Sequence, residues 1–276
     1  MKSRFVALLA LTLCFSGRAS AAAPFTDKNL EAAVRAELHD TKTTPLTETD
    51  LNNVYFLETP GKDIKDLAGL EKCKNLAQLK LTRNQVADLK PLKDLTNLQW
   101  LDLAENKISD VTPLAGLTKL QYLELSKNQI AKVDALKGLT SLSALDLSSN
   151  KITDVAPLGG LTRLSSLYLG HNQISDLGLL AKVTKLSSLN LKDNRISDLA
   201  PLGKQTDLRT LIIEKNKITD LGPLVKMAKA DANGEKRFAP YLELYLADNP
   251  LSDEAKSKQL AALKEIGVRV HEEQTK

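Results

Sequence analysis

The side chains that could carry chemistry in this 276-residue chain do not come together as a catalytic centre. Its three histidines are His39 near the N-terminus, His171 in mid-chain and His271 near the C-terminus. A nucleophile needs a base within hydrogen-bond reach, and the sequence pattern places no Ser or Cys beside His171. Neither a glycine-rich phosphate loop nor a zinc-type spacing of His and Cys is present. The sequence therefore predicts a non-enzymatic protein that uses no cofactor and no metal.

A repeat of 22 residues dominates the middle of the chain. Each of its marker asparagines follows Leu or Ile at minus five and minus three and Leu at minus eight, an alternation that predicts a short strand with one apolar face. A single unit cannot bury its leucines, so stacked units must do so, at roughly 1.5–3 kcal/mol per fully buried side chain. We expect the asparagine amides to satisfy backbone groups at the bend after each strand. The markers are Asn84, Asn106, Asn128, Asn150, Asn172, Asn194 and Asn216.

Each strand must be followed by a return segment, because parallel strands need crossover connections. Prolines at 91, 113, 157, 201 and 223 fit the first position of a tight helical turn. Aspartates four residues after the asparagines would cap the free N–H groups of that turn. Cys73 takes the position of the leucines on this side of the unit, so we expect a buried, unreactive thiol. The capping aspartates are Asp88, Asp110, Asp154, Asp176, Asp198 and Asp220.

The repeat resembles the leucine-rich repeat pattern L-x-x-L-x-L-x-x-N-x-L in its 22-residue form. It is most similar to bacterial internalin-type proteins, through runs such as Asn194-Arg-Ile-Ser-Asp198-Leu-Ala-Pro201-Leu202. The resemblance covers roughly residues 54–251. It implies an α/β leucine-rich repeat solenoid, with a curved parallel sheet on the concave side and 3₁₀ or helical turns on the convex side. Helical caps at both ends are part of the same expectation, as is a role in binding a protein partner.

The segments on either side of the repeats differ in character from them. Residues 1–23 carry Lys2 and Arg4 before a short apolar run and end in small residues, which is typical of a signal peptide cleaved near Ala21 or Ala22. We therefore expect a secreted or periplasmic protein. Residues 24–53 predict a helical N-terminal cap, and residues 252–276 predict a capping helix, a short strand and a polar tail.

About nine repeats fill residues 54–251, and the last of them is stretched. The spacing from Asn216 to Asn249 is 33 residues, so eleven extra residues fall near 229–240. Basic side chains and Phe238 make this insertion a secondary candidate contact, although a flexible, solvated loop is the simpler interpretation.

The charge balance excludes two classes of partner. The net charge is +4, and without Lys2, Arg4 and Arg18 the chain has 35 basic and 34 acidic residues. A nearly neutral chain with interspersed signs gives no footprint for nucleic acid or an anionic membrane. No later stretch approaches the 18 apolar residues that a membrane span needs. We expect a monomer that does not insert into a membrane.

Large aromatic side chains gather on the predicted concave surface, at minus six and minus four from each asparagine. Trp100 and Tyr122 stand one strand apart there, and large exposed aromatics are typical of binding hot spots. The alternative is that the two rings simply pack on each other as a cross-strand pair. The aromatic candidates for partner binding are Phe56, Trp100, Tyr122, Tyr168 and Tyr245.

Three acidic residues follow on successive strands of the same surface: Asp102, Glu124 and Asp146. Like charges on neighbouring strands repel, and Lys107, Lys127 and Lys151 could neutralise them. One interpretation is a solvated surface of mixed sign. The other is an acidic strip that suits a partner with Lys or Arg at its contact point.

Taken together, these features predict an exported protein-binding module that holds a protein partner on its concave surface. The alternative is a carbohydrate or cell-wall glycan binder, because aromatic side chains also stack against sugar rings.

Overall fold

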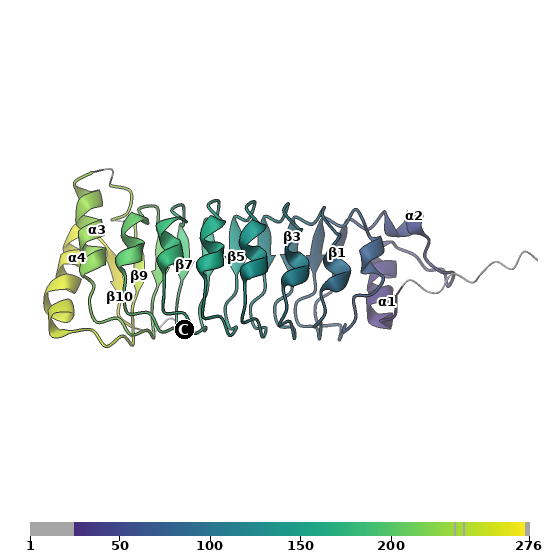
Figure 1. Cartoon of the computed structure of the whole chain (residues 1–276), viewed down its shortest axis with the longest axis horizontal. Coiled ribbons are helices and arrows are strands. Elements are labelled where there is room, and N and C mark those ends of the chain that lie inside the picture. The colour runs from purple at the N-terminus through teal and green to yellow at the C-terminus, as the bar shows by residue number, and fades with distance from the viewer. Residues whose placement is uncertain (1–24, 235, 240, 274–276) are drawn as a thin grey trace, which may run out of the picture.

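Ten short parallel strands form one open sheet in the order β1 to β10, with every strand beside its neighbour in sequence (Figure 1). The computed structural model describes residues 25–234, 236–239 and 241–273, so the predicted signal peptide lies outside the described residues. The strands are β1 (Phe56–Glu58), β2 (Gln78–Lys80), β3 (Trp100–Asp102), β4 (Tyr122–Glu124), β5 (Ala144–Asp146), β6 (Ser166–Tyr168), β7 (Ser188–Asn190), β8 (Thr210–Ile212), β9 (Glu243–Tyr245) and β10 (Arg269–His271).

The core is a continuous column of leucines that runs the length of the solenoid. The middle residue of each strand points inward and pairs with its equivalent in the next repeat, as Leu101 does with Leu123. The first and third residues point outward, because successive side chains of a strand alternate between faces. We call the outward surface formed by these two positions of β1–β10 the sheet face. The predicted leucine-rich repeat solenoid is confirmed.

Helical turns lie opposite the sheet. In the regular units, aspartates bond to the first residue of each turn: Asp110 Oδ1 accepts from the N–H of Thr112 at 2.8 Å. Asp88, Asp154, Asp176, Asp198 and Asp220 make the same bond, which confirms their predicted capping role. The turns are η1 (Leu70–Lys72), η2 (Lys90–Leu92), η3 (Thr112–Leu114), η4 (Asp134–Gly138), η5 (Ala156–Gly160), η6 (Gly178–Ala181), η7 (Ala200–Lys204) and helix α3 (Gly222–Ala232).

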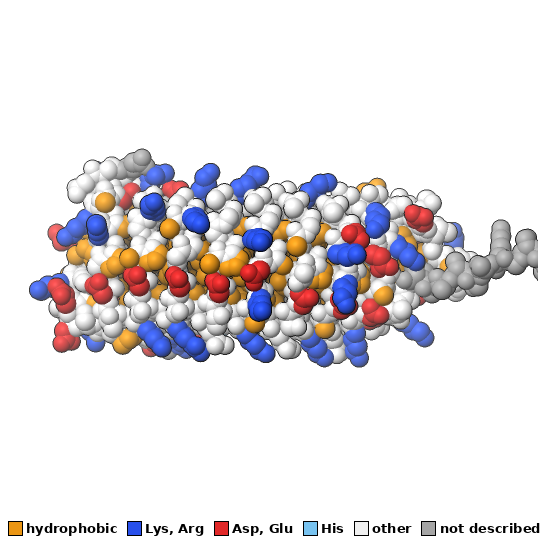
Figure 2. Space-filling model, viewed as in Figure 1, with side chains coloured by type: hydrophobic (Ala, Val, Ile, Leu, Met, Phe, Trp, Pro, Cys, Tyr) orange, Lys and Arg blue, Asp and Glu red, His pale blue; other side chains and the backbone are white. Residues whose placement is uncertain are grey.

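Charged side chains of opposite sign are interspersed along the sequence but lie in separate rows on the surface. On the side of the helical turns, acidic side chains form a row along the solenoid, and basic side chains lie above and below it (Figure 2). Residues at the same position of successive repeats line up along the solenoid, so a near-neutral chain still presents separate strips of each sign.

The marker asparagines tie each repeat to the one before it. Asn106 Oδ1 accepts from the N–H of Val86 at 3.0 Å, and its amide donates to the carbonyls of Leu81 and Leu103. Most of these side chains are buried, and the equivalent asparagines repeat the pattern. The predicted structural role of the asparagine column is confirmed.

The N-terminal end of the solenoid is covered by α1 (Lys28–Glu37) and α2 (Glu48–Leu51). Asp27 joins α1 to the first repeat: its Oδ1 accepts from the N–H groups of Asn29 and Leu30, and its Oδ2 accepts from those of Lys65 and Asp66. One carboxylate thus caps the helix and fixes its position on the array.

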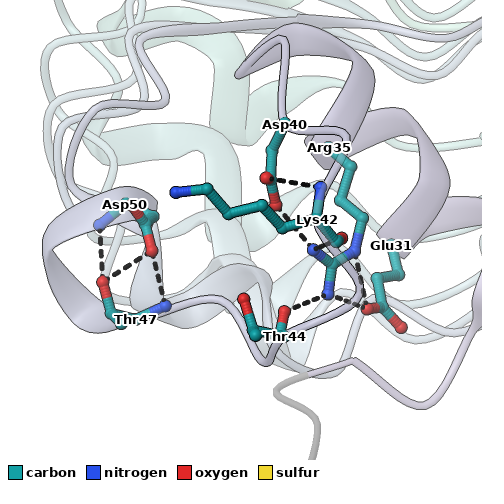
Figure 3. A network of polar contacts seen from close by, with 7 residues as sticks. All are labelled: Glu31, Arg35, Asp40, Lys42, Thr44, Thr47 and Asp50. Atoms are coloured by element: carbon teal, nitrogen blue, oxygen red, sulfur yellow. Dashed lines mark hydrogen bonds and ion pairs between the residues drawn. The ribbon is translucent and has the colours of Figure 1, made fainter.

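The segment between α1 and α2 is held by one guanidinium group (Figure 3). Arg35 pairs with Glu31 at 2.7 Å and with Asp40 at 2.6 Å, and donates to the carbonyls of Lys42 and Thr44. A guanidinium has five N–H donors in a fixed plane, which suits four acceptors arranged around it. This network connects the helix to an otherwise exposed stretch of chain.

The insertion near residue 230 is partly helical and partly packed into the core. Helix α3 extends to Ala232, and Asp231 then accepts from the N–H groups of Arg237 and Phe238. Phe238 is fully buried. The expectation of a flexible, solvated loop was wrong, because burial of the Phe238 ring offsets the entropy cost of ordering the extra residues. Phe238 is therefore not available as a contact.

The C-terminal end consists of a π-helical turn, η8 (Ala255–Gln259), helix α4 (Leu260–Ile266) and β10. Gly267 ends α4 in the left-handed region, with φ of 103°, and the chain then joins the sheet beside β9. Among the described residues, no helix has the length and apolar character that crossing a membrane requires.

Candidate binding surface

Trp100 and Tyr122 form an aromatic stack on the sheet face. Their strands are in register, and the ring centroids lie 3.7 Å apart with the planes only 10° from parallel. Trp100 still exposes 42% of its surface, while Tyr122 is half-buried. Cross-strand packing therefore occurs, as the alternative interpretation supposed, but it does not remove the tryptophan from solvent.

A shallow groove, which we call the aromatic groove, runs across the stack. Phe56, which is 54% exposed, stands at one end of it, and Ala144 stands at the other beside Tyr122. Because Ala144 is small, the side of the tyrosine that faces β5 is not covered by a large neighbour. The remaining lining residues are Ala77, Gln78, Gln99, Gln121 and Ser143.

Two of the five predicted aromatics lie outside this groove. Tyr168 is half-buried on β6, in register with Asp146 and Asn190. Tyr245 stacks on His271 of the last strand, with centroids 4.3 Å apart. The structure therefore gathers Phe56, Trp100 and Tyr122 at one place and leaves Tyr245 as part of the C-terminal packing.

The acidic residues Asp102, Glu124 and Asp146 are in register on β3, β4 and β5. They are less exposed than the sequence suggested. Asp102 is only 9% exposed, and its carboxylate accepts from the N–H of Ala104. The strip therefore offers Glu124 and Asp146 rather than three exposed carboxylates.

Burial changes the acidity of this strip. It raises the pKa of Glu124 to about 7, and the neighbouring charge of Asp146 adds to the effect. Burial also raises the pKa of Asp146, although the N–H of Ser148 bonds to its Oδ1 at 2.7 Å. For Tyr122, burial and then the charge of Glu124 raise the phenol pKa to about 12.

Two of the three lysines that could neutralise the strip bind elsewhere. Lys127 pairs with Glu105 at 3.0 Å, and Lys107 donates to Gln85 at 3.1 Å. Both partners lie in the segments that follow the strands. Among the described residues, no lysine forms an ion pair with Glu124 or Asp146, so the possible neutralisation by lysine is not found.

The groups considered for catalysis are placed as follows. His171 Nδ1 lies 2.9 Å from Asp193 Oδ2 at an exposed site on the bend of its repeat. Burial raises the pKa of the Cys73 thiol to about 12, which fits the predicted unreactive cysteine. Within residues 25–273, apart from 235 and 240, no three His, Cys, Asp or Glu side chains are grouped as a metal ion would need.

A second groove, which the sequence reasoning missed, lies at the edge of the sheet where the strands begin. It adjoins the first, since Gln99, Gln121 and Ser143 line both. Its other lining residues are Lys119, Ser141 and Arg163, which are spaced 22 residues apart. The 22-residue spacing could have shown that these three residues lie side by side. They precede the strands, however, and the sequence reasoning considered only the outward positions of the strands.

Comparison with known proteins agrees with this architecture. A family model for leucine-rich repeats (two copies) matches residues 96–138, 140–182 and 184–226. No curated protein sequence matches the chain. Among solved structures, internalin C2 from Listeria monocytogenes is 36% identical with a TM-score of 0.71, over 74% of this chain and 91% of that one.

Two further structures are similar over most of this chain. The functional domain of InlJ from Listeria monocytogenes, which includes a cysteine ladder, is 27% identical with a TM-score of 0.63, over 88% of this chain and 54% of its own. The ectodomain of the receptor kinase GASSHO1/SCHENGEN3 from Arabidopsis thaliana, in complex with CASPARIAN STRIP INTEGRITY FACTOR 2, is 21% identical with a TM-score of 0.60. It covers 75% of this chain and 29% of its own, and shows the fold alone.

Leucine-rich repeat scaffolds typically mediate interactions between proteins rather than catalysis. The repeat model, the ten-stranded parallel sheet and the identity to internalin C2 lead to one assignment. The chain belongs to the bacterial internalin-like leucine-rich repeat proteins.

Proposed function

We propose that the chain is an exported, non-enzymatic module that holds a protein partner on its sheet face, centred on the Trp100–Tyr122 stack. The observation that carries the proposal is the exposed Trp100 in a solenoid whose core is already filled by leucines. An indole that adds nothing to the core is best explained by a partner that covers it. The plant ectodomain in complex with an integrity factor is a precedent for ligand binding on this fold.

The neighbouring carboxyls add a requirement on the partner. Glu124 and Asp146 lie beside the stack, and both hold protons more tightly than free side chains do. A Lys or Arg of the partner would stabilise their ionised forms and displace those protons. Binding would then release protons and weaken below neutral pH.

Glycan binding is the second candidate, because amide and hydroxyl side chains surround the aromatic groove. The stacked geometry is less favourable to it. A sugar stacks on the face of a ring, and in this pair each ring has one face covered by the other. Retention on glycan or peptidoglycan matrices, competed by free sugar, would support the glycan function in place of the protein function.

The test is a pull-down with protein beginning at Ala22, from the envelope of the producing cell and from host extracts. The W100A/Y122A variant should lose a specific protein band while its unfolding midpoint stays close to that of the wild type, since a cross-strand aromatic pair contributes only ~0.2–1 kcal/mol. The matched control is Tyr241→Ala, which removes a 53% exposed tyrosine away from the stack. A band that survives in W100A/Y122A would contradict the proposal.

Export has its own test. N-terminal sequencing of the protein recovered from the periplasm and from the culture medium should find Ala22 or Ala23 as the first residue. Recovery of the full-length chain from the cytoplasm alone would contradict export.

A further inference from the structure

The groove at the start of the strands is lined by two cations and by neutral donors. Lys119 and Arg163 occupy the same position of the repeat, two units apart, with Ser141 between them. With strands about 4.8 Å apart, their main chains are separated by roughly 10 Å. No Asp or Glu lines the groove.

The positive charges of this groove are not balanced within the described part of the chain. Both side chains are exposed. Lys119 donates to a neutral acceptor, Asn97 Oδ1, at 2.8 Å. For Arg163, no hydrogen bond or ion pair is found among the described residues. Its guanidinium therefore keeps its fork of donors available for an anion, the geometry that pairs with a carboxylate through two parallel hydrogen bonds.

This groove and the aromatic groove form one surface. Gln99, Gln121 and Ser143 line both, so nothing larger than an amide separates Arg163 and Lys119 from the Trp100–Tyr122 stack. Gln121 directly precedes Tyr122, and its side chain is exposed. A ligand that rests on the aromatic rings is therefore within reach of the two cations.

The surface also changes sign along the strands. Glu124 lies five residues after Lys119, a separation of at most about 16 Å, the length of five fully extended residues at about 3.3 Å each. Along that line the cations come first, the stack lies in the middle, and the carboxyls of Glu124 and Asp146 come last. A uniform polyanion, such as a sulfated glycan, would be attracted by Lys119 and Arg163 and repelled by Glu124 and Asp146.

We propose that the groove of Lys119, Ser141 and Arg163 is an anion subsite that takes the carboxylate of an acidic peptide segment of the partner. The adjoining apolar or aromatic side chain of that segment covers the Trp100–Tyr122 stack. The inference rests on the proposed function, since it describes the chemistry of the partner at the same surface. A peptide fits better than a glycan because only a segment with different side chains matches a surface that changes sign.

The experiment selects a phage-displayed library of random 12-residue peptides on four forms of the protein. They are the wild type, K119S/R163S, W100A/Y122A and the control K137S/K204S. Serine is the residue that the same column already carries at Ser141, so K119S/R163S should fold normally. Lys137 and Lys204 lie on the turns η4 and η7, so the control removes the same charge from the opposite side.

The wild type and the control should enrich peptides with Asp or Glu within a few residues of an aromatic or leucine. K119S/R163S should bind those peptides roughly tenfold more weakly or worse, because charge-assisted hydrogen bonds are lost, and the control should change binding less than about twofold. W100A/Y122A should not enrich them at all.

Other outcomes overturn specific claims. Peptides that need Trp100 and Tyr122 but show no acidic residues, or bind K119S/R163S equally well, would overturn the anion subsite and leave the proposed function standing. Acidic peptides that bind W100A/Y122A unchanged would show adhesion to a basic surface and overturn both. Heparin that binds through Lys119 and Arg163 while acidic peptides do not would overturn the peptide assignment.

Discussion

Glu124 on β4 lies in register beside Asp146 on β5, and both carboxyls have raised pKa values on a surface that keeps them partly out of water. Burial raises the pKa of both carboxyls, the charge of Asp146 raises the pKa of Glu124 further, and Lys107 and Lys127 are engaged with other partners. A pKa of about 7 for Glu124 in the folded chain makes stability depend on pH near neutrality, and under the proposed function it would make partner binding depend on pH as well.

The first prediction concerns this proton. The pKa of Glu124 is about 7 in the folded chain and about 4.5 when unfolded, so the folded state binds more protons between those values. Stability should therefore be greatest below about pH 5 for this group and fall as the pH rises through 7. Because the site is partly exposed, we expect a loss of only about 1–2 kcal/mol in the free energy of unfolding.

Urea unfolding of the wild type and of Glu124→Gln at several values between pH 5 and 8 measures this effect. Glutamine has the same shape and no proton to lose, so the decline should be much shallower in the variant. Equal slopes for the two proteins over this range would contradict the account.

The second prediction concerns Gln205, a buried amide where the other repeats have Leu, Val or, in the first, Cys73. Its Nε2 donates at 2.7 Å to the carbonyls of Leu180 and Val183, in the preceding repeat. In a regular repeat the equivalent carbonyls of Leu158 and Leu161 accept from backbone N–H groups instead. The irregular turn, where Leu179 replaces proline, thus depends on the next repeat.

Gln205→Leu should lower the free energy of unfolding by about 1–2 kcal/mol, because two buried carbonyls lose their donor. In the Leu179→Pro background, where the turn regains the common sequence, the same substitution should cost less. Urea unfolding of the four proteins in this double-mutant cycle gives the coupling. A neutral or stabilising Gln205→Leu in the wild-type background would show that the amide bonds add nothing.

The third prediction concerns the attachment of the N-terminal cap. Burial alone would raise the pKa of Asp27, but bonds from four backbone N–H groups outweigh it and hold that pKa below its usual range. Asp27→Ala should destabilise α1 by roughly 0.5–2 kcal/mol. Asp27→Asn keeps one acceptor oxygen and should lose less.

Hydrogen exchange of the α1 amides reports on this end separately from the repeats. Faster exchange in α1 with unchanged exchange in β3 to β8 is expected for Asp27→Ala. If exchange rises equally along the whole solenoid, Asp27 does not act locally as described.

The fourth prediction concerns Cys73. Its thiol is fully buried, and burial together with the charge of Glu71 raises its pKa to about 12. Only the thiolate reacts with disulfide reagents, so the native protein should be inert towards a thiol-reactive chromogenic disulfide at pH 8 and become reactive in urea. Rapid modification of the native chain would contradict this burial.

Much of the fold could be predicted from the sequence because each repeat obeys the same local rules. The 22-residue spacing of residues such as Asn106 and Asn128 fixes the strands, and Asp110 fixes the start of the turn. The insertion could not be predicted, since nothing local to Phe238 says that its ring enters the core. Its N–H donates to Asp231 of α3, a contact within the insertion that has no periodic signal.

The candidate surface was predictable in part. Outward positions of the strands placed Trp100 and Tyr122 side by side, as found. The burial of Asp102 and the pairing of Lys127 with Glu105 depend on side-chain conformations, which the position of a residue in the repeat does not determine. The groove of Lys119, Ser141 and Arg163 was missed because its basic residues are 44 positions apart in the sequence. Neither the net charge nor the charge of a short segment shows that they lie together.

The central claim, that a protein partner covers the sheet face at the aromatic stack, is tested most directly by photo-cross-linking. A benzophenone side chain at position 144, which lines the aromatic groove, should yield an adduct with one partner protein. The same group at position 137, on the turn η4, should yield none. An adduct with that protein from position 137 but not from position 144 would contradict the claim and place the binding surface on the helical turns.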